Sequence, residues 1–209
     1  MQLVVLTDEL LKEELLSNGI QSNLNVEWIH SPEQFLSQEN ADAFIDLLFD
    51  GSKERIELLK KLTQPVIIHS VEKTLADINA NFIRINAWPT FLKREIVEAS
   101  CLKEEQKQPA ENIFSAFSKK IEWLPDEPGF VSARVVAMII NEGWMAFNEG
   151  VSSKNEIDIA MKLGTNYPYG PFEWGAKIGE EKILALLNEM AKSNSRYLPA
   201  KFSGITEMH

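Results

Sequence analysis

Several features that commonly define protein classes are scarce in this 209-residue sequence. There is one cysteine, Cys101, so no internal disulfide can form, and no cluster of cysteine and histidine indicates a zinc site. Positive charge is also scarce: 21 Lys and Arg face 31 Asp and Glu, which gives a formal net charge of -10. That balance argues against nucleic acid or an anionic membrane surface as a partner.

Long apolar runs are missing as well. No stretch approaches the roughly 18 residues that a membrane helix needs. The N-terminal sequence MQLVVLTDELLKEELL lacks the basic head and apolar stretch of a signal peptide. We therefore expect a cytoplasmic protein without a membrane segment.

The first part of the chain alternates short apolar stretches with helical ones. The expected strands are 3–7, 26–30, 43–49, 65–70 and 82–88. Ser31, followed by Pro32, and Ser52 are suited to cap two of the intervening helices. Because apolar strands that alternate with helices form a parallel sheet covered on both faces, residues 1–124 are expected to form a trimmed, doubly wound α/β domain of the Rossmann type.

The pattern over 125–209 is helical throughout, which predicts a second, all-helical domain. The stretch 134–147 is so rich in apolar residues that a central, buried helix is expected. In the next helix, Ser153 and Glu156 have the spacing of a capping box, and Gly164 suits its C-terminal end.

Three stretches of this second part carry a resemblance to a known family. They are DEPGFVSARVVAMIINEG, EIDIAMKLGTNYPYGPFEWGAKIG and RYLPAKF. Together they resemble the C-terminal helical domain of the 3-hydroxyacyl-CoA dehydrogenase family. The match is good from Pro125 to Phe202 and weaker backwards through INAWPTFLKREIVEAS.

The resemblance implies a Rossmann-like domain followed by an all-α domain of the 6-phosphogluconate dehydrogenase C-terminal-like type. It also implies a place in fatty-acid metabolism, a homodimer formed through the helical domain, and an acyl-CoA ligand. Members of the family oxidise a 3-hydroxyacyl-CoA with NAD, using a histidine as the base, a glutamate that orients it, and an asparagine at the substrate oxygen.

The glycine-rich turn that such a cofactor needs is missing. A dinucleotide fingerprint places three glycines between the first strand and the first helix. Here the first glycine is Gly19, and Asp8 and Glu9 occupy the place of the phosphates, at the positive end of the helix dipole. From these residues we expect no cofactor, although the family uses NAD.

The family's reacting residues are also replaced. Aligning IVE at 96–98 with the family's glutamate motif places Glu98 on the orienting glutamate and Asn86 on the histidine. An asparagine side chain cannot act as a general base in this pH range. In PGFVSAR, Ala133 stands at the family's asparagine, while Arg134 is retained. Arg134 is a candidate contact for a CoA phosphate, or else a member of an ion pair inside the helical domain.

Three functions remain open from the sequence. The first is a catalytically degenerate relative that serves as an acyl-CoA-binding or dimerising scaffold. The alternative is an active NAD-dependent oxidoreductase with an altered site, and the third is an altered enzyme that uses another cofactor. His69, at the end of an expected strand, is a candidate to act with Glu72 or Glu98, but its pattern fits a structural histidine better. Glu173, in the loop GPFEW, is expected to anchor a corner between two helices.

Overall fold

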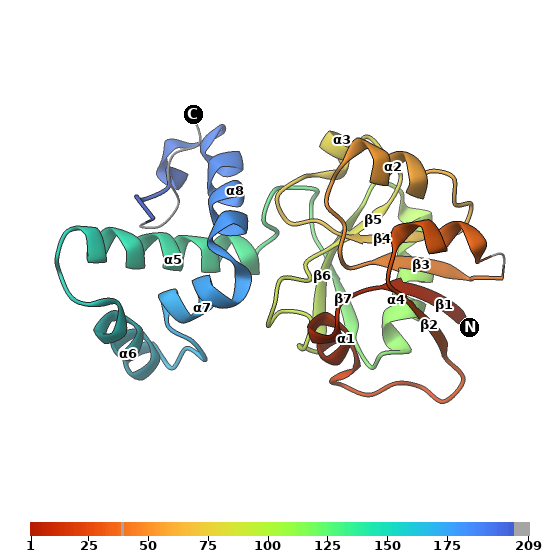
Figure 1. Cartoon of the computed structure of the whole chain (residues 1–209), viewed down its shortest axis with the longest axis horizontal. Helices are drawn as coiled ribbons and strands as arrows, with labels where there is room; N and C mark the ends of the chain where they lie inside the picture. Colours follow the sequence, from red (N-terminus) through yellow and green to blue (C-terminus); the bar gives the residue numbers. More distant parts are fainter. Residues whose placement is uncertain (39, 203–209) are drawn as a thin grey trace. The chain divides into compact units, whose positions relative to one another are not determined.

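The computed structural model describes residues 1–38 and 40–202 and divides into two compact units (Figure 1). Unit 1 comprises Met1–Phe130 and unit 2 comprises Val131–His209. The sequence placed this division after residue 124, whereas residues 125–130 pack on unit 1. For example, Gly129 donates its backbone N–H to the carbonyl of Val71 at 2.8 Å.

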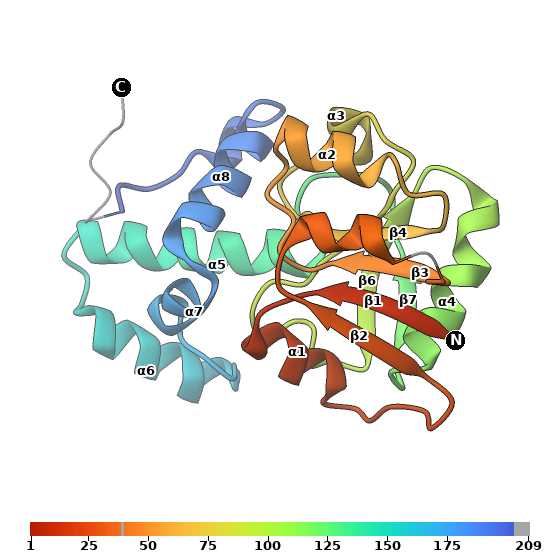
Figure 2. The ribbon, with the colours of Figure 1, turned by 45° about the vertical axis from the view of Figure 1, so that its right-hand side comes forward.

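Unit 1 is built on one seven-stranded sheet with the order β2-β1-β3-β4-β5-β6-β7 (Figure 2). Strands β1 to β5 are parallel, as predicted; β6 pairs antiparallel with β5, and β7 pairs parallel with β6. The bounds are β1 Gln2–Leu6, β2 Asn25–Ile29, β3 Ala43–Asp46, β4 Val66–His69, β5 Ile83–Ile85, β6 Ile96–Cys101 and β7 Lys120–Trp123.

Helices cover both faces of this sheet. On β1, Leu3 and Val5 point into one apolar core while Val4 and Leu6 point into the other, which is the period of two expected for a strand. Residues of α1 and α4 pack in the first core, and residues of η1, α2 and α3 pack in the second. These elements are α1 Glu9–Leu16, the 3-10 helix η1 Pro32–Ser37, α2 Lys53–Leu59, α3 Leu75–Ile78, the 3-10 helix η2 Glu104–Gln106 and α4 Lys107–Ser115.

Local predictions in unit 1 had mixed outcomes. Ser52 caps α2 as expected, because its hydroxyl accepts from the N–H of Arg55 at 3.2 Å. The segment after Ser31 is a 3-10 helix rather than an α-helix. The sheet extends past the five expected strands, because β6 runs through Glu98 and β7 follows it.

Unit 2 is helical, as predicted. It contains α5 Ser132–Asn148, α6 Lys154–Thr165, α7 Pro171–Ile178, α8 Glu180–Ala191 and the 3-10 helix η3 Ser195–Tyr197. The capping box of Ser153 and Glu156 is confirmed. Gly164 is not the helix stop: α6 continues to Thr165 and ends at Asn166, whose φ of 56° is left-handed.

The central helix α5 is buried on one side only. Its core face includes Ala133, Ala137 and Ile140, but Val135 is 52% exposed and Met145 is 40% exposed. The expectation of a helix buried all round is therefore wrong for this chain.

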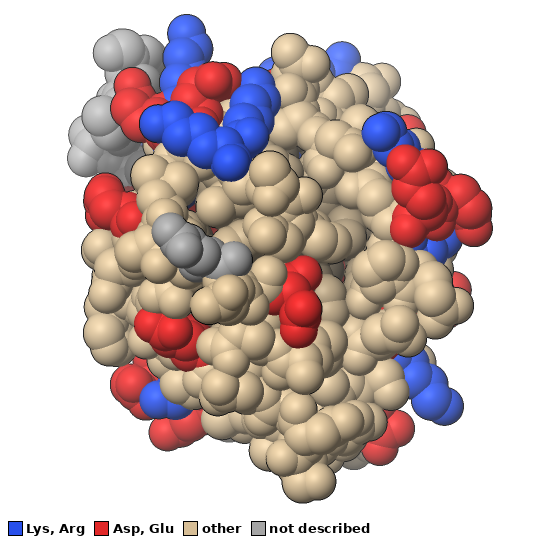
Figure 3. All heavy atoms as spheres, turned by 90° about the vertical axis from the view of Figure 1, so that its right-hand side faces the viewer, with Lys and Arg blue, Asp and Glu red and all other residues tan. Residues whose placement is uncertain are grey.

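Charged side chains on the face drawn in Figure 3 lie in small groups of both signs, separated by uncharged residues, so this face carries no continuous basic surface. Among the helices of residues 1–38 and 40–202, none combines the length and the apolar character required to span a bilayer.

Candidate functional site

The two positions matched to the family's base and its orienting glutamate lie side by side in unit 1. Asn86 directly follows β5, and Glu98 lies on the antiparallel neighbour β6. The backbone N–H of Asn86 donates to the carbonyl of Glu98 at 3.1 Å, and Asn86 Nδ2 donates to Glu98 Oε2 at 3.0 Å. The strand pairing thus brings together two residues that are twelve positions apart in the sequence.

A second contact fixes the orientation of the Asn86 side chain. Its Oδ1 accepts from the backbone N–H of Trp88 at 3.2 Å, and the residue is 3% exposed. Because Oδ1 faces an N–H donor and Nδ2 faces a carboxylate acceptor, the hydrogen bonds fix which end of the Asn86 amide is oxygen and which is nitrogen. This group offers hydrogen bonds but no proton acceptor that titrates near neutral pH.

The nearest histidine along this sheet edge is held by the backbone. His69 ends β4, and its Nδ1 accepts from the N–H of Ala87 at 3.0 Å, next to Asn86 in the chain. Because Nδ1 is an acceptor, the neutral ring carries its proton on Nε2. His69 therefore supports the end of β5, as the structural interpretation of the sequence proposed, and its Nδ1 is not open to a substrate proton.

The turn between β1 and α1 is closed by its own side chain. Asp8 caps α1, with Oδ1 accepting from the N–H of Leu11 at 2.8 Å, and the Thr7 hydroxyl donates to the carbonyl of Asp8 at 3.0 Å. The helix N-terminus thus already faces a carboxylate. A glycine-rich pyrophosphate cradle uses the same N–H groups, so these residues do not fit that mode of dinucleotide binding.

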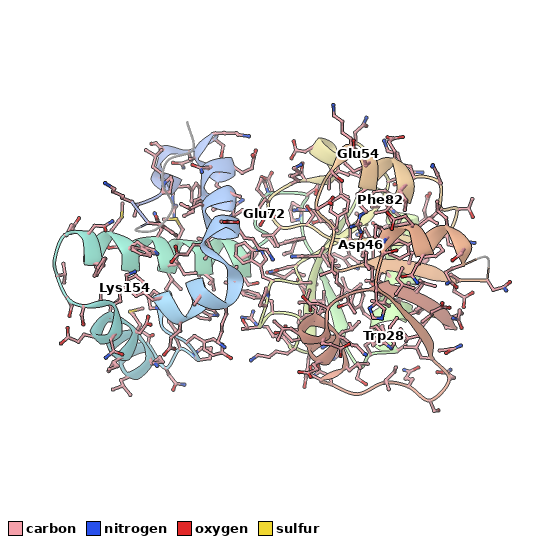
Figure 4. All side chains as sticks on the ribbon, viewed as in Figure 1. Trp28, Asp46, Glu54, Glu72, Phe82 and Lys154 are labelled. Carbon is pink, nitrogen blue, oxygen red and sulfur yellow. The ribbon has the colours of Figure 1, made fainter. Side chains whose placement is uncertain are left out.

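One feature of this edge was missed by the sequence reasoning. Asp46, labelled in Figure 4, ends β3 and is fully buried. It pairs with Arg55 of α2, with 2.7 Å between Oδ2 and Nη1. The N–H of Leu48 donates to Asp46 Oδ1 at 3.1 Å. Burial raises the pKa of Asp46 from 3.8 to about 6, against the opposing effect of the Arg55 guanidinium. The sequence feature that could have indicated Asp46 is a carboxylate at the end of an apolar strand.

The other two predicted site residues lie in unit 2. Ala133 is fully buried near the start of α5 and offers no hydrogen-bonding side chain. Arg134 packs its guanidinium over the ring of Tyr197, 5.6 Å from the centroid, and Nη1 lies 3.4 Å from the Tyr197 hydroxyl. These contacts place Arg134 among the side chains of its own unit.

The corner between α6 and α7 is anchored as expected. Glu173 Oε2 accepts from the N–H of Gly170 at 3.1 Å, and Oε1 forms an ion pair with Lys162. Asp158 of α6 adds a second anchor, because its carboxylate accepts from the N–H groups of Phe172 and Glu173 at 2.8 and 3.2 Å. Within the part of the chain that the structure describes, no group of three or more His, Cys, Asp or Glu could hold a metal ion.

Comparison with known proteins identifies relatives of both units. Residues 129–205 match the model of the 3-hydroxyacyl-CoA dehydrogenase C-terminal domain. The 3-hydroxyadipyl-CoA dehydrogenase of Escherichia coli K12 is 47% identical over 83 residues, which are 39% of this chain and 18% of that protein. The 3-hydroxybutyryl-CoA dehydrogenase of Clostridioides difficile is 30% identical over 164 residues, covering 69% of this chain and 58% of the relative.

A solved structure from a further organism has the same fold. The crystal structure of (S)-3-hydroxybutyryl-CoA dehydrogenase from Ralstonia eutropha superposes with a TM-score of 0.74 at 17% identity, over 95% of this chain and 90% of that one. This similarity confirms the predicted architecture, a Rossmann-like domain followed by a helical one. The chain nevertheless spans less than two thirds of the lengths of the two curated relatives.

The expectation of no cofactor is wrong for a protein of this ancestry, because these relatives represent a family of NAD-dependent dehydrogenases. The closed β1–α1 turn still gives no basis for deriving a step through the nicotinamide. What the comparisons establish is descent: the chain belongs to the 3-hydroxyacyl-CoA dehydrogenase family.

Proposed function

We propose that this protein is a catalytically degenerate member of its family, which binds an acyl-CoA thioester and acts as a dimeric scaffold in fatty-acid metabolism. The observation that carries the proposal is the Asn86–Glu98 pair. The position of the family's base holds an amide that is anchored at 3.0 Å to the glutamate and at 3.2 Å to a backbone N–H.

A dehydrogenase must remove the proton of the substrate hydroxyl while hydride leaves. Asn86 cannot accept that proton, and Ala133 cannot hydrogen-bond the substrate oxygen. The two replacements remove groups that act on the reacting oxygen, and binding of a thioester is a separate property that calorimetry can measure. Residence in the cytoplasm is part of this proposal.

The dimer half of the proposal is supported by the outer side of α5. Val131, Val135, Met138 and Met145 lie on the side away from its core face, and three of them are at least 40% exposed. A stripe of this kind is the sort of surface that a second copy covers in an isologous dimer. Val135→Lys places a charge in the stripe and should shift the protein from dimer to monomer in light scattering. A dimer that survives this change would exclude the stripe as its interface.

The catalytic half is tested by turnover. The full chain is incubated with (S)-3-hydroxybutyryl-CoA and NAD, and in reverse with acetoacetyl-CoA and NADH, while absorbance at 340 nm is followed. We expect no turnover above the protein-free rate, together with calorimetric binding of acetoacetyl-CoA. NAD-dependent turnover would refute degeneracy and favour the alternative, an oxidoreductase with an altered site. Absence of acyl-CoA binding would refute the ligand.

A matched variant tests the role of Asn86. Asn86→His restores the family's residue next to Glu98, whereas Asn86→Gln retains an amide. If the missing base limits the chemistry, turnover should appear or rise only in Asn86→His, and further when Ala133→Asn is added. Equal rates in the histidine and glutamine variants would contradict this reasoning.

A further inference from the structure

Lys154, the first residue of α6, holds its ammonium group among three aromatic rings. Nζ lies 3.8 Å from the ring centroid of Trp144, 5.1 Å from that of Phe147 and 5.3 Å from that of Phe172. Trp144 and Phe147 belong to α5 and Phe172 to α7, so the ammonium joins three helices. Figure 4 places Lys154 between α5 and α6. We call Trp144, Phe147 and Phe172 the cage.

The local electrostatics of the helix do not favour a cation here. The N-terminus of a helix carries a partial positive charge, which disfavours a lysine in the first turn. Among residues 1–38 and 40–202, the ammonium group of Lys154 takes part in no ion pair or side-chain hydrogen bond. The ring faces are therefore its compensating contacts, and their negative quadrupoles attract an ammonium group.

The cage is anchored in the core by one of its rings, Trp144, while Phe147 and Phe172 are half-buried. Trp144 is 1% exposed, and its ring stacks on Phe202 with 5.1 Å between centroids and 20° between planes. It also meets Phe147 and Phe172 edge-on, at 5.8 and 5.2 Å. Lys154 itself is half-buried, so its side chain is reachable from solvent while the rings are fixed.

Such a cage distinguishes modifications of the amine by their charge. Methylation keeps the positive charge, whereas acylation converts the ammonium into a neutral amide. We propose that Lys154 is a modification-sensitive site read by this cage: acylation of Nζ releases the start of α6 from α5 and α7, and methylation does not.

The modifying chemistry follows from the class of donor. The lone pair of the deprotonated amine attacks the carbonyl carbon of an acyl thioester. A C–N bond forms, the C–S bond breaks, and the departing thiolate takes up the proton released from nitrogen. The choice of a thioester rests on the proposed function, whereas the response of the cage depends only on the charge at Nζ.

The experiment installs each charge state chemically, so its outcome is independent of acyl-CoA binding. Lys154→Cys is made in the full chain with Cys101→Ser and then alkylated to three lysine analogues: the primary amine, the trimethylammonium and the acetylated amine. Amide hydrogen exchange is measured over residues 154–158. The same series at Lys182, an exposed lysine of α8, is the control.

A cation–π contact of about 0.5–2 kcal/mol corresponds to roughly twofold to 30-fold faster exchange when the charge is removed. At position 154 we expect this acceleration for the acetylated analogue. The trimethyl analogue at 154 should exchange no faster than the primary amine. At position 182 the three analogues should give the same exchange rates. Equal exchange of the acetylated and amine forms at 154 would overturn the proposal. So would a trimethyl form that exchanges as fast as the acetylated one, because the cage would then respond to size rather than charge.

Discussion

The carboxylate of Asp158 makes a quantitative prediction about the corner that carries the clearest family motif. Asp158 lies in α6 and is 7% exposed. Its Oδ1 accepts from the N–H of Phe172 at 2.8 Å and its Oδ2 from the N–H of Glu173 at 3.2 Å. These donors belong to the first turn of α7, where no helical carbonyl is available to them. Asp158→Ala leaves both without this partner.

The magnitude follows from two contributions. Loss of a capping side chain costs about 0.5–2 kcal/mol. An N–H left unsatisfied in a partly buried place costs about 1–3 kcal/mol. Because solvent and Glu173 offset part of this, the free energy of opening the corner should fall by about 2–4 kcal/mol, which is roughly 30-fold to 1,000-fold in an equilibrium constant.

The assay is amide hydrogen exchange over residues 171–178 in the full chain. Asp158→Ala should accelerate exchange by that factor, and Asp158→Asn by less, because one amide oxygen can still accept a hydrogen bond. Glu181→Gln, an exposed change on α8, is the control and should leave exchange unaltered. Unchanged protection of residues 171–178 in Asp158→Ala would refute the reasoning, because it would mean that the two hydrogen bonds do not hold the corner.

Three further predictions concern packing and pH. In Gly170→Ala the new Cβ would lie 2.4 Å from the Cα of Asp158, so the thermal midpoint should fall further than in Asp158→Ala, and an equal midpoint would contradict that clash. Burial raises the pKa of Asp46 to about 6, so the folded state favours the protonated carboxyl. The contribution of Asp46 to the free energy of unfolding is therefore fully present below pH 3.8 and is lost as pH rises through 6. Urea unfolding of the wild type should therefore lose on the order of 3 kcal/mol across this range relative to Asp46→Asn, and parallel pH profiles would count against it. Burial lowers the pKa of Lys119 to about 8, so stability should rise above pH 8 in the wild type and not in Lys119→Met.

The sequence predicted strands and helix caps correctly where a few neighbouring residues determine them. The first five strands and the capping residues Ser52 and Ser153 were recognised because apolar alternation and N-cap chemistry act over a few residues. It misjudged the end of α6, since Asn166 rather than Gly164 adopts the left-handed conformation. It also misjudged α5, because apolar composition alone does not state which side of a helix the neighbouring helices cover.

The candidate site was predicted in identity but not in arrangement. Asn86 and Glu98 were selected by alignment to a family motif, while their hydrogen bond depends on the antiparallel pairing of β5 with β6. Asp46 was missed, because an aspartate at the end of a strand is common and its partner Arg55 comes from the next helix. A desolvated charge is visible only once the surrounding chain is placed.

The sequence by itself determined the class and the ancestry of this protein. Hydrophobic periodicity separated an α/β part from a helical part, and the run DIAMKLGTNYPYGPFEW carried the family signature. Tertiary structure alone decided the antiparallel β6, the buried Asp46–Arg55 pair and the cage around Lys154. The physical reason is that each of these features depends on contacts between elements that are separate in the sequence. Bringing such elements together costs chain entropy, and only the packing of the whole unit offsets that cost.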